Sequence, residues 1–339
     1  MRRVALDTSV VDTGDSGGDY FYATTSRSFP TGCTLLDCVL NGGWSQGRII
    51  NIVGDAGTGK TLLAMEAAAN FLETYPDGKV FYEEPEAVFD EEYAKGLGIP
   101  MHRICLGRPD TVEDFYERLT RRLEKYAGTP MLYILDSLDA LTSAVERDRA
   151  FDKASYGGDK PKQMGQLFRR CVRAINETDA TLIIISQTRD NIGVMFGDRQ
   201  RVSGGRALKF YASQIVWLAQ TKTIKRTIKK VVRTVGIRVR VKCKKNKIGP
   251  SFRECDFPLI FLYGVDDLMA NLEWLKSVGR LADATGPGRK EYEGRIESMG
   301  RKAYRRECAR VSCIVKGTWK EVEHRFAPRR QKYGTHGED

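Results

Sequence analysis

A glycine-rich segment constrains this chain more than any other part of it. Residues 49–53 form an apolar, β-branched run, and residues 54–61 then fit the pattern G-x-x-x-x-G-K-[ST]. In a strand–loop–helix unit of this kind, the glycines let backbone N–H groups turn inward toward a bound anion. The helix points its positive N-terminal end at that anion. A chance match in a glycine-containing turn is the alternative, but the helical pattern that begins at Leu62 argues against it. The segment therefore predicts a nucleotide-phosphate site.

The residues of this segment have separate expected roles. We expect Lys60 to reach the β- and γ-phosphates and the Thr61 hydroxyl to ligate Mg²⁺. The predicted phosphate cradle comprises Gly54, Asp55, Ala56, Gly57, Thr58, Gly59, Lys60, Thr61 and Leu62. The expected cofactors are therefore ATP and Mg²⁺.

A second carboxylate-bearing segment fits the same site. Residues 131–135 form an apolar strand that ends at Asp136. Many strands end in aspartate only because aspartate caps a helix after the strand, so this ending alone indicates little. In proteins with a phosphate loop, however, an aspartate at the end of a downstream strand holds Mg²⁺ directly or through water. We therefore predict Asp136 and Thr61 as the magnesium residues.

Hydrolysis also requires a group that activates water. The segment 81–86 ends a predicted strand with three carboxylates, Glu83, Glu84 and Glu86. Any one of them could accept a proton near the bound phosphate. The alternative is an ordinary charged strand end, and the residues alone do not choose among the three.

The remaining pattern predicts an α/β fold with a mostly parallel, doubly wound sheet, because apolar strands alternate with amphipathic helices. The expected strands are 48–53, 79–84, 103–106, 131–135, 181–186, 213–218, 237–244 and 257–262, and the expected helices are 60–74, 90–97, 112–126 and 164–178. Glycine-rich stretches at 157–161 and 203–205 predict two long loops on the nucleotide side. We expect an N-terminal arm at 1–28, an ATPase core at 29–270 and a basic C-terminal region at 271–339.

Charge is distributed unevenly along the 339 residues, whose net charge is +11. Residues 199–253 contain seventeen Lys or Arg and no Asp or Glu. A solvated charged face is one explanation, but so long a stretch without acids favours a polyanion such as nucleic acid. The eight cysteines are scattered without C-x-x-C spacing, which does not favour a zinc site. No apolar run approaches the roughly 20 residues of a membrane helix, and no secretory signal pattern begins the chain.

Five blocks of this sequence resemble the RecA-type recombinases. They are 54–61, 84–98, 132–141, 185–213 and Lys245-Asn246-Lys247-Ile248 with Phe252, and the resemblance extends over about 29–279. The resemblance implies a RecA-like P-loop core that binds ATP, single-stranded DNA and double-stranded DNA. It also implies a homo-oligomeric helical filament that performs homologous pairing and strand exchange. The cytoplasm of a bacterium or of a phage-infected host would be its location, without a membrane partner.

The resemblance assigns catalytic and base-binding roles to particular residues. Glu86 takes the position of the water-activating glutamate, and Gln187 that of the glutamine that senses the γ-phosphate. Lys245 and Lys247 match lysines that reach the ATP of a neighbouring subunit, where they would act as an arginine finger does. The residues matched to adenine contacts are Asp90, Tyr93 and Tyr263, and Tyr93 offers an aromatic face for stacking.

Two loops, about 145–165 and 187–205, correspond to the DNA loops of the resembled family. Arginines and backbone amides in or near them would hold phosphates, and apolar side chains would lie against bases. The predicted DNA-binding residues are Met164, Arg169, Arg189, Met195, Phe196, Gly204, Gly205 and Arg206. Core packing is the alternative for Met195 and Phe196, although a glycine-bounded polar loop is an unusual place for core residues.

The ends of the chain depart from the family pattern. The segment 20–23, Tyr-Phe-Tyr-Ala, resembles a polymerisation strand of archaeal and eukaryotic members, and a plain edge strand explains it equally well. Residues 292–339 are basic where bacterial members end in an acidic tail. A viral member of the family would fit this mixture. The alternatives to a recombinase are a hexameric helicase or related ring ATPase, and a DNA-binding filament protein that holds ATP without hydrolysing it.

Overall fold

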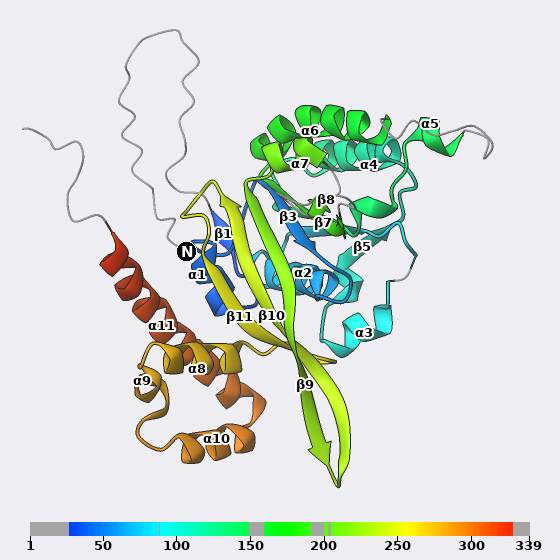
Figure 1. Cartoon of the computed structure of the whole chain (residues 1–339). Helices are drawn as coiled ribbons and strands as arrows, with labels where there is room; N and C mark the ends of the chain where they lie inside the picture. The colour runs from blue at the N-terminus through cyan, green and yellow to red at the C-terminus, as the bar shows by residue number, and fades with distance from the viewer. Residues whose placement is uncertain (1–26, 88, 149–158, 191–199, 203–204, 328–339) are drawn as a thin grey trace, which may run out of the picture.

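A computed structural model describes residues 27–87, 89–148, 159–190, 200–202 and 205–327 of the chain. Its centre is one large sheet with the strand order β12-β11-β10-β9-β3-β7-β6-β4-β5, and β8 pairs with β7 off this path. The pairs from β9 to β5 along this order are parallel, whereas those from β12 to β9 are antiparallel. The expected mostly parallel α/β sheet is confirmed, with an antiparallel extension at one edge (Figure 1).

The strands of the parallel part are buried apolar runs, as a sheet covered on both faces requires. All six residues of β3 are buried, and so are all five of β6. The strands of the described chain are β1 (Ser28–Phe29), β2 (Trp44–Ser45), β3 (Ile49–Gly54), β4 (Lys79–Glu83), β5 (Ile104–Gly107), β6 (Met131–Leu135), β7 (Ala180–Asp190), β8 (Gln200–Val202), β9 (Gln214–Ile228), β10 (Val231–Asn246), β11 (Glu254–Ile260) and β12 (Gly264–Val265).

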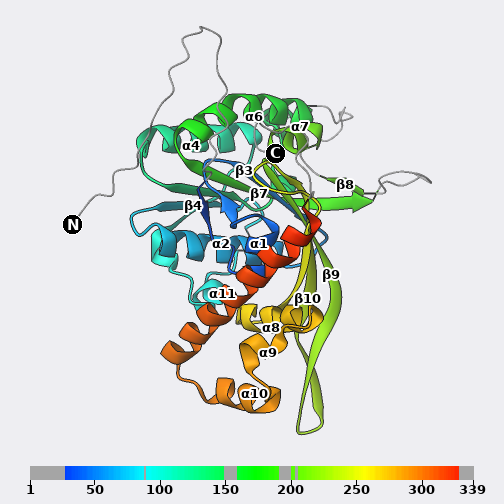
Figure 2. The same ribbon diagram turned by 90° about the vertical axis from the view of Figure 1, so that its left-hand side faces the viewer.

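Helices cover both faces of this sheet. On one face lie α1 (Thr34–Val39), α2 (Lys60–Thr74), α8 (Asp267–Ser277) and α11 (Arg301–Phe326), which share one hydrophobic core with the sheet. On the other lie α4 (Val112–Lys125), α6 (Asp159–Glu177) and α7 (Gly205–Tyr211), which build a second core (Figures 1 and 2). The remaining α-helices of the described residues are α3 (Glu91–Gly96), α5 (Ala144–Arg147), α9 (Leu281–Thr285) and α10 (Arg289–Ser298).

The amphipathic pattern of α4 illustrates why these helices form where they do. The Thr111 side chain accepts a hydrogen bond from the Asp114 N–H and so satisfies one free donor of the first turn. Phe115, Leu119 and Leu123 then recur at helical spacing and are buried against the sheet. The expected helices 60–74, 90–97 and 112–126 agree with α2, α3 and α4 to within one residue at each end.

Two expectations about the elements were wrong in extent. The strands expected at 213–218 and 237–244 are parts of a much longer hairpin, β9–β10, because its outer half carries polar residues on both faces and so lacks a buried apolar signal. Residues 159–165, expected within the first long loop, belong to α6.

The C-terminal helices are packed onto the same core. Residue 270, the expected end of the core, falls within α8, and Val311 and Val315 of α11 are buried in the first core. The Thr34 hydroxyl of α1 contacts the carboxylate of Asp267 at 2.8 Å and the hydroxyl of Ser312 at 2.8 Å. Within the described residues, no helix is both long and apolar enough to cross a bilayer.

Candidate active site

The glycine-rich segment forms a loop between β3 and the first turn of α2. Gly57 and Gly59 have φ values of 72° and 87°, in the left-handed region that favours glycine. A Cβ on Gly59 would stand 2.2 Å from the Leu259 side chain, and one on Gly54 would stand 2.7 Å from the Leu218 carbonyl oxygen. At Gly57, by contrast, a Cβ would meet open space. The loop is therefore closed against the sheet and open on the side where the helix N-terminus would meet an anion.

Lys60 lies at the start of α2, at the centre of a group of carboxylates. Its ammonium donates a hydrogen bond of 2.7 Å to the Asp55 carbonyl oxygen, and its side chain is buried. Burial lowers the pKa of Lys60, whereas the surrounding negative charges of Asp136, Asp55, Asp139 and Glu86 raise it, in that order. A cation among four acids is suited to bind a phosphate chain together with a divalent ion.

Asp136 lies beyond the carboxyl end of β6, next to Thr61. The Tyr82 hydroxyl donates a hydrogen bond of 2.7 Å to its carboxylate, and the Thr61 hydroxyl is hydrogen-bonded to it too. Burial raises the pKa of Asp136, and these two hydrogen bonds and the charge of Lys60 oppose the rise. A carboxylate beside a hydroxyl at the phosphate loop supplies the oxygen ligands that Mg²⁺ prefers. The residues present therefore fit the predicted magnesium site.

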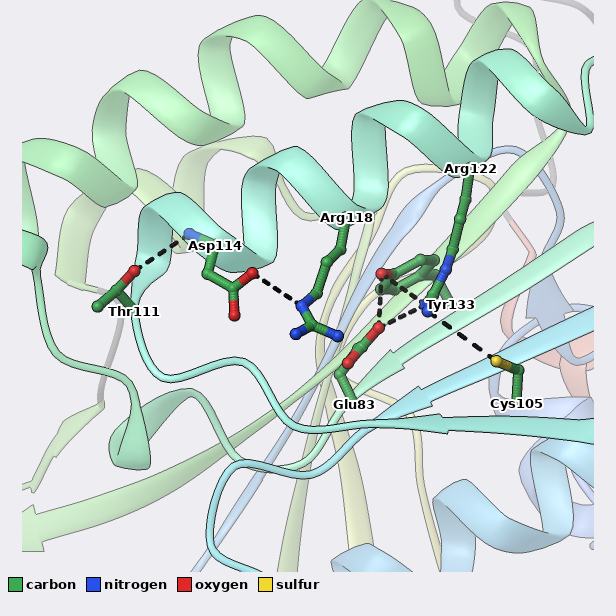
Figure 3. Close-up of polar contacts among 7 residues, drawn as sticks. All are labelled: Glu83, Cys105, Thr111, Asp114, Arg118, Arg122 and Tyr133. Atoms are coloured by element: carbon green, nitrogen blue, oxygen red, sulfur yellow. Dashed lines mark hydrogen bonds and ion pairs between the residues drawn. The ribbon is translucent and has the colours of Figure 1, made fainter.

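Of the three carboxylates left open by the sequence, Glu83 is tied into the sheet. Its side chain is fully buried, it forms an ion pair with Arg122, and it accepts a 2.8 Å hydrogen bond from the Tyr133 hydroxyl (Figure 3). The Arg122 guanidinium lies over the Phe81 ring at 4.3 Å, and it approaches the sulfur of Cys105 at 4.0 Å. These contacts stabilise the sheet and leave Glu83 unsuited to activate water.

Glu86 has the surroundings that a water-activating base needs. It is exposed, whereas Glu84 is 5% exposed. The Ser137 hydroxyl donates a hydrogen bond of 2.8 Å to the Glu86 carboxylate, and Ser137 directly follows Asp136 in the chain. Of the three, Glu86 is also the one whose negative charge acts on both Lys60 and Asp136.

Gln187 lies beside the start of the phosphate loop. In the parallel pairing of β3 with β7 it stands opposite Gly54, and its backbone N–H donates a hydrogen bond of 2.8 Å to the Asp139 carboxylate. The next residue, Thr188, donates a hydrogen bond from its hydroxyl to the Asp55 carboxylate. β7 then continues to Asp190 and pairs with β8, so the second predicted DNA loop begins as a hairpin stem at the nucleotide site.

The residues predicted to contact adenine lie in two places. Asp90 accepts a 2.8 Å hydrogen bond from the Tyr93 N–H and so caps α3, and the Tyr93 side chain is half-buried. Tyr263 follows β11 instead, and its hydroxyl lies 3.1 Å from that of Tyr304 in α11. These assignments stay predictions.

Lys245 and Lys247 lie two residues apart at the end of β10. The Lys245 ammonium donates hydrogen bonds of 2.8 Å to the carbonyl oxygens of Lys209 and Phe210 at the end of α7. Burial lowers the pKa of Lys245 to about 8, and the neighbouring charges of Lys247 and Lys209 contribute to the lowering. Lys247 is exposed. Within one chain, Lys245 thus caps the helix that comes after the second predicted loop.

Met164, which was predicted to contact bases, is buried in the second hydrophobic core, and its contact with bases stays a prediction. Met164 belongs to α6 and is 1% exposed within the second core, because the helix begins at Asp159 and turns this residue toward the sheet. Arg169 is exposed on the same helix. Arg189 lies in β7, and Gly205 and Arg206 begin α7. The predicted contacts Met195, Phe196 and Gly204 lie outside the described residues.

Four residues of this site were not found from the sequence. Tyr82 and Ser137 donate hydrogen bonds to the predicted site carboxylates Asp136 and Glu86. Asp139 accepts one from the backbone of Gln187, and Thr188 donates one to Asp55 of the glycine-rich loop. Ser137 and Thr188 directly follow Asp136 and Gln187, so their position next to predicted site residues is a signal that could have identified them. Tyr82 and Asp139 carry no comparable signal.

Comparison with known proteins identifies the family. A family model described as RecA N-terminal domain matches residues 9–266. The chain belongs to the RecA family. Protein RecA of Streptomyces avermitilis and of Streptomyces coelicolor are each 35% identical to it over 237 residues, which cover 70% of this chain. Protein RecA of Mycobacterium ulcerans is 35% identical over the same length. The match spans 60% and 61% of the Streptomyces relatives and 66% of the Mycobacterium relative.

Proposed function

We propose that this RecA family member is an ATP-dependent DNA recombinase. It would form a helical filament on single-stranded DNA, pair that strand with a homologous duplex and exchange strands. ATP would bind between subunits and be hydrolysed in response to DNA. The group of Lys60, Thr61, Glu86 and Asp136 around one phosphate loop, with Gln187 opposite Gly54, is the observation that carries this proposal.

Each residue of the site has a defined part in hydrolysis. Mg²⁺, held by Thr61 and Asp136, would neutralise charge on the phosphates. Lys60 would give up its hydrogen bond to the Asp55 carbonyl oxygen and bind the phosphates as a cation. Glu86, kept in place by Ser137, would take the proton of the attacking water.

Gln187 and Thr188 would connect this chemistry to DNA. Both lie in β7, whose continuation pairs with β8 at the base of the second predicted loop. A γ-phosphate that attracts the Gln187 side chain would shift the strand and with it the loop stem. Arg189 and Arg206, at the two ends of this loop, would then hold DNA phosphates, and Met195 and Phe196 would lie against bases.

Lys245 and Lys247 would complete the ATP site of a neighbouring subunit. For Lys245 this requires release of the carbonyl oxygens of Lys209 and Phe210 at the end of α7. Filament assembly and movement of α7 would therefore be linked. We propose the cytoplasm of a bacterium or of a phage-infected host as the place of action.

Electron microscopy with long single-stranded DNA, Mg²⁺ and a non-hydrolysable ATP analogue tests this function. We expect continuous helical filaments on the DNA that require the nucleotide. Closed rings on the strand would instead favour a hexameric helicase or related ring ATPase. Filaments that form equally well without any nucleotide would contradict the proposed ATP dependence.

A further inference from the structure

A cavity of about 500 Å³ lies between α1 and α11, on the face of the sheet that carries the first core. The two helices lie side by side there (Figure 2), and Pro250, in the turn between β10 and β11, borders the same space. Its apolar surface comes from Pro250, from Cys38 and Val39 of α1, and from Trp319 of α11. The volume is within the range of sites that hold small molecules or short peptide segments.

Trp319 gives this cavity a fixed aromatic surface. The Trp319 ring packs against the ring of Trp274 in α8, with 5.5 Å between their centroids, and it is half-buried. Because its position is set by this packing, an apolar side chain that entered the cavity would meet a surface that is already ordered.

The carboxylate of Asp37 lines the cavity and has one oxygen without a partner. The backbone N–H and the hydroxyl of Thr31 each donate a hydrogen bond of 2.8 Å to Asp37 Oδ1, whereas no described residue donates one to Oδ2. Asp37 is only 6% exposed. Burial raises the pKa of Asp37 to about 6, against the hydrogen bonds from Thr31 and the charge of Lys316. A buried acceptor of this kind requires a donor, and the cavity is the side from which one can arrive.

Two lysines add positive charge at the same cavity. Lys316 and Lys320 are exposed on one face of α11, one helical turn apart, and within the part of the chain that the structure describes neither forms an ion pair. Arg253 and Glu323 also line the cavity but pair with each other, at 2.8 Å between Arg253 Nε and Glu323 Oε1. The charges of Arg253 and Glu323 therefore offset each other, and the two lysines stay available to an acidic group.

We propose that this cavity binds an acidic peptide segment of a partner protein. An apolar side chain of the segment would pack against Trp319, its carboxylates would lie at Lys316 and Lys320, and a backbone N–H would donate to Asp37 Oδ2. The spacing is suitable, because side chains one helical turn apart are about 5–6 Å from each other. Acids at alternate positions of an extended segment are separated by a similar ~6.6 Å.

A nucleic acid suits the cavity less well than a peptide. Asp37 and Glu323 place two carboxylates in the lining, and these would repel a chain of phosphates. A peptide instead uses the buried carboxylate as a hydrogen-bond acceptor and requires positive charge at only one or two positions. The combination of a buried acceptor, an aromatic surface and two neighbouring cations therefore favours a peptide.

A labelled peptide, Asp-Asp-Phe-Asp-Asp, tests the proposal by fluorescence anisotropy with the full chain at low salt, without ATP or DNA. We expect saturable binding that weakens about fivefold or more in Lys316→Gln with Lys320→Gln, since two ion pairs are lost. Asp37→Asn keeps an acceptor for Thr31 but replaces Oδ2 by an N–H₂ group, and should weaken binding about tenfold. The same peptide with alanine in place of phenylalanine should bind at least about tenfold more weakly to the wild type.

The matched control is Arg305→Gln with Arg306→Gln. It removes two exposed charges from the same helix at positions that do not line the cavity, and it should bind the peptide as the wild type does. Thermal unfolding of each variant shows whether it is folded. If Asp37→Asn fails to fold, the lysine variant still decides the outcome, because both of its substituted side chains are exposed.

Several results would overturn the proposal. Absence of saturable binding to the wild type would do so, as would equal binding by the wild type and the lysine variant. An equal loss in the arginine control would indicate a general attraction of acids to a basic helix. A labelled oligothymidylate that loses affinity in the lysine variant, when the peptide does not bind, would replace the peptide by nucleic acid. The outcome is independent of the proposed recombinase function, because the peptide assay requires neither ATP nor a filament.

Discussion

The Thr188 hydroxyl donates a hydrogen bond to the Asp55 carboxylate, which links the phosphate loop to the stem of the second predicted DNA loop. Thr188 pairs with Val202 across that stem, and it follows Gln187, whose backbone is held by Asp139. A shift of the phosphate loop on ATP binding would therefore be transmitted to β7 and β8 through a side-chain contact as well as through Gln187.

Removal of this link should weaken the coupling between nucleotide and DNA. Thr188→Val keeps the shape of the side chain and loses the donor, at a cost of about 1 kcal/mol for one hydrogen bond. We expect stimulation of the ATPase by single-stranded DNA to fall about fivefold, with ATP affinity near that of the wild type. Thr188→Ser retains the hydroxyl and should behave as the wild type. Equal stimulation in both variants would mean that the contact carries no coupling.

The two best-defined carboxylates of the segment 83–86 should respond differently to the same substitution. Glu86→Gln should still bind ATP but lower turnover by at least ~10²-fold, the low end for loss of a general base. Glu83→Gln leaves the Arg122 guanidinium without its ionic partner in a buried position, and should lower the free energy of unfolding by about 3 kcal/mol. Turnover and thermal unfolding of both variants check this. Normal turnover in Glu86→Gln would remove the assignment of the base.

Lys245 and Lys247 are best tested by mixing two inactive variants. The double variant Lys245→Ala, Lys247→Ala retains Glu86, and the variant Glu86→Gln retains both lysines. In a head-to-tail filament, random mixing in equal amounts joins an intact Glu86 to intact lysines at about one interface in four. We expect DNA-stimulated turnover to return in the mixture. If both variants form filaments and the mixture stays inactive, the lysines do not act across the interface.

The lowered pKa of Lys245 predicts a pH effect near 8. Above this pH the free protomer loses the ammonium charge, so stimulation by DNA should fall as pH rises through 8. Unfolding does not explain this fall. Folding lowers the pKa of Lys245 from its ordinary value of 10.5 to about 8, so this group makes the free energy of unfolding rise as the pH increases between these two values. Lys245→Arg stays charged across this range and should abolish the fall. An unchanged pH profile in this variant would exclude Lys245 as the titrating group.

The sequence predicted the parallel sheet and the strand–loop–helix unit at residues 49–74 well, for a physical reason. Both are local patterns: a buried strand such as residues 49–53 reads as an apolar run, and the cradle reads as glycines at fixed spacing. The burial of Met164 was not predicted, because an apolar residue at the start of an expected helix can face either the sheet or the neighbouring loop. Its burial depends on packing between α6 and the sheet, which the local sequence does not encode.

The residues alone left the choice among Glu83, Glu84 and Glu86 open, and the family resemblance favoured Glu86. Their spacing is compatible with several orientations, and the structure distinguishes them by partners distant in the chain, Arg122 for Glu83 and Ser137 for Glu86. The outer half of the β9–β10 hairpin was missed for the opposite reason. It carries polar residues on both faces and no buried periodicity, although the absence of acids between residues 199 and 253 marked the region as unusual.

Strand exchange between circular single-stranded DNA and a homologous linear duplex, in the presence of ATP and Mg²⁺, is the decisive measurement for the proposed recombinase. We predict joint molecules with the homologous duplex and none with an unrelated duplex of equal length. Glu86→Gln should form joints but release its DNA more slowly than the wild type. A wild-type protein that hydrolyses ATP on single-stranded DNA but forms no joints with the homologous duplex would contradict the proposed function.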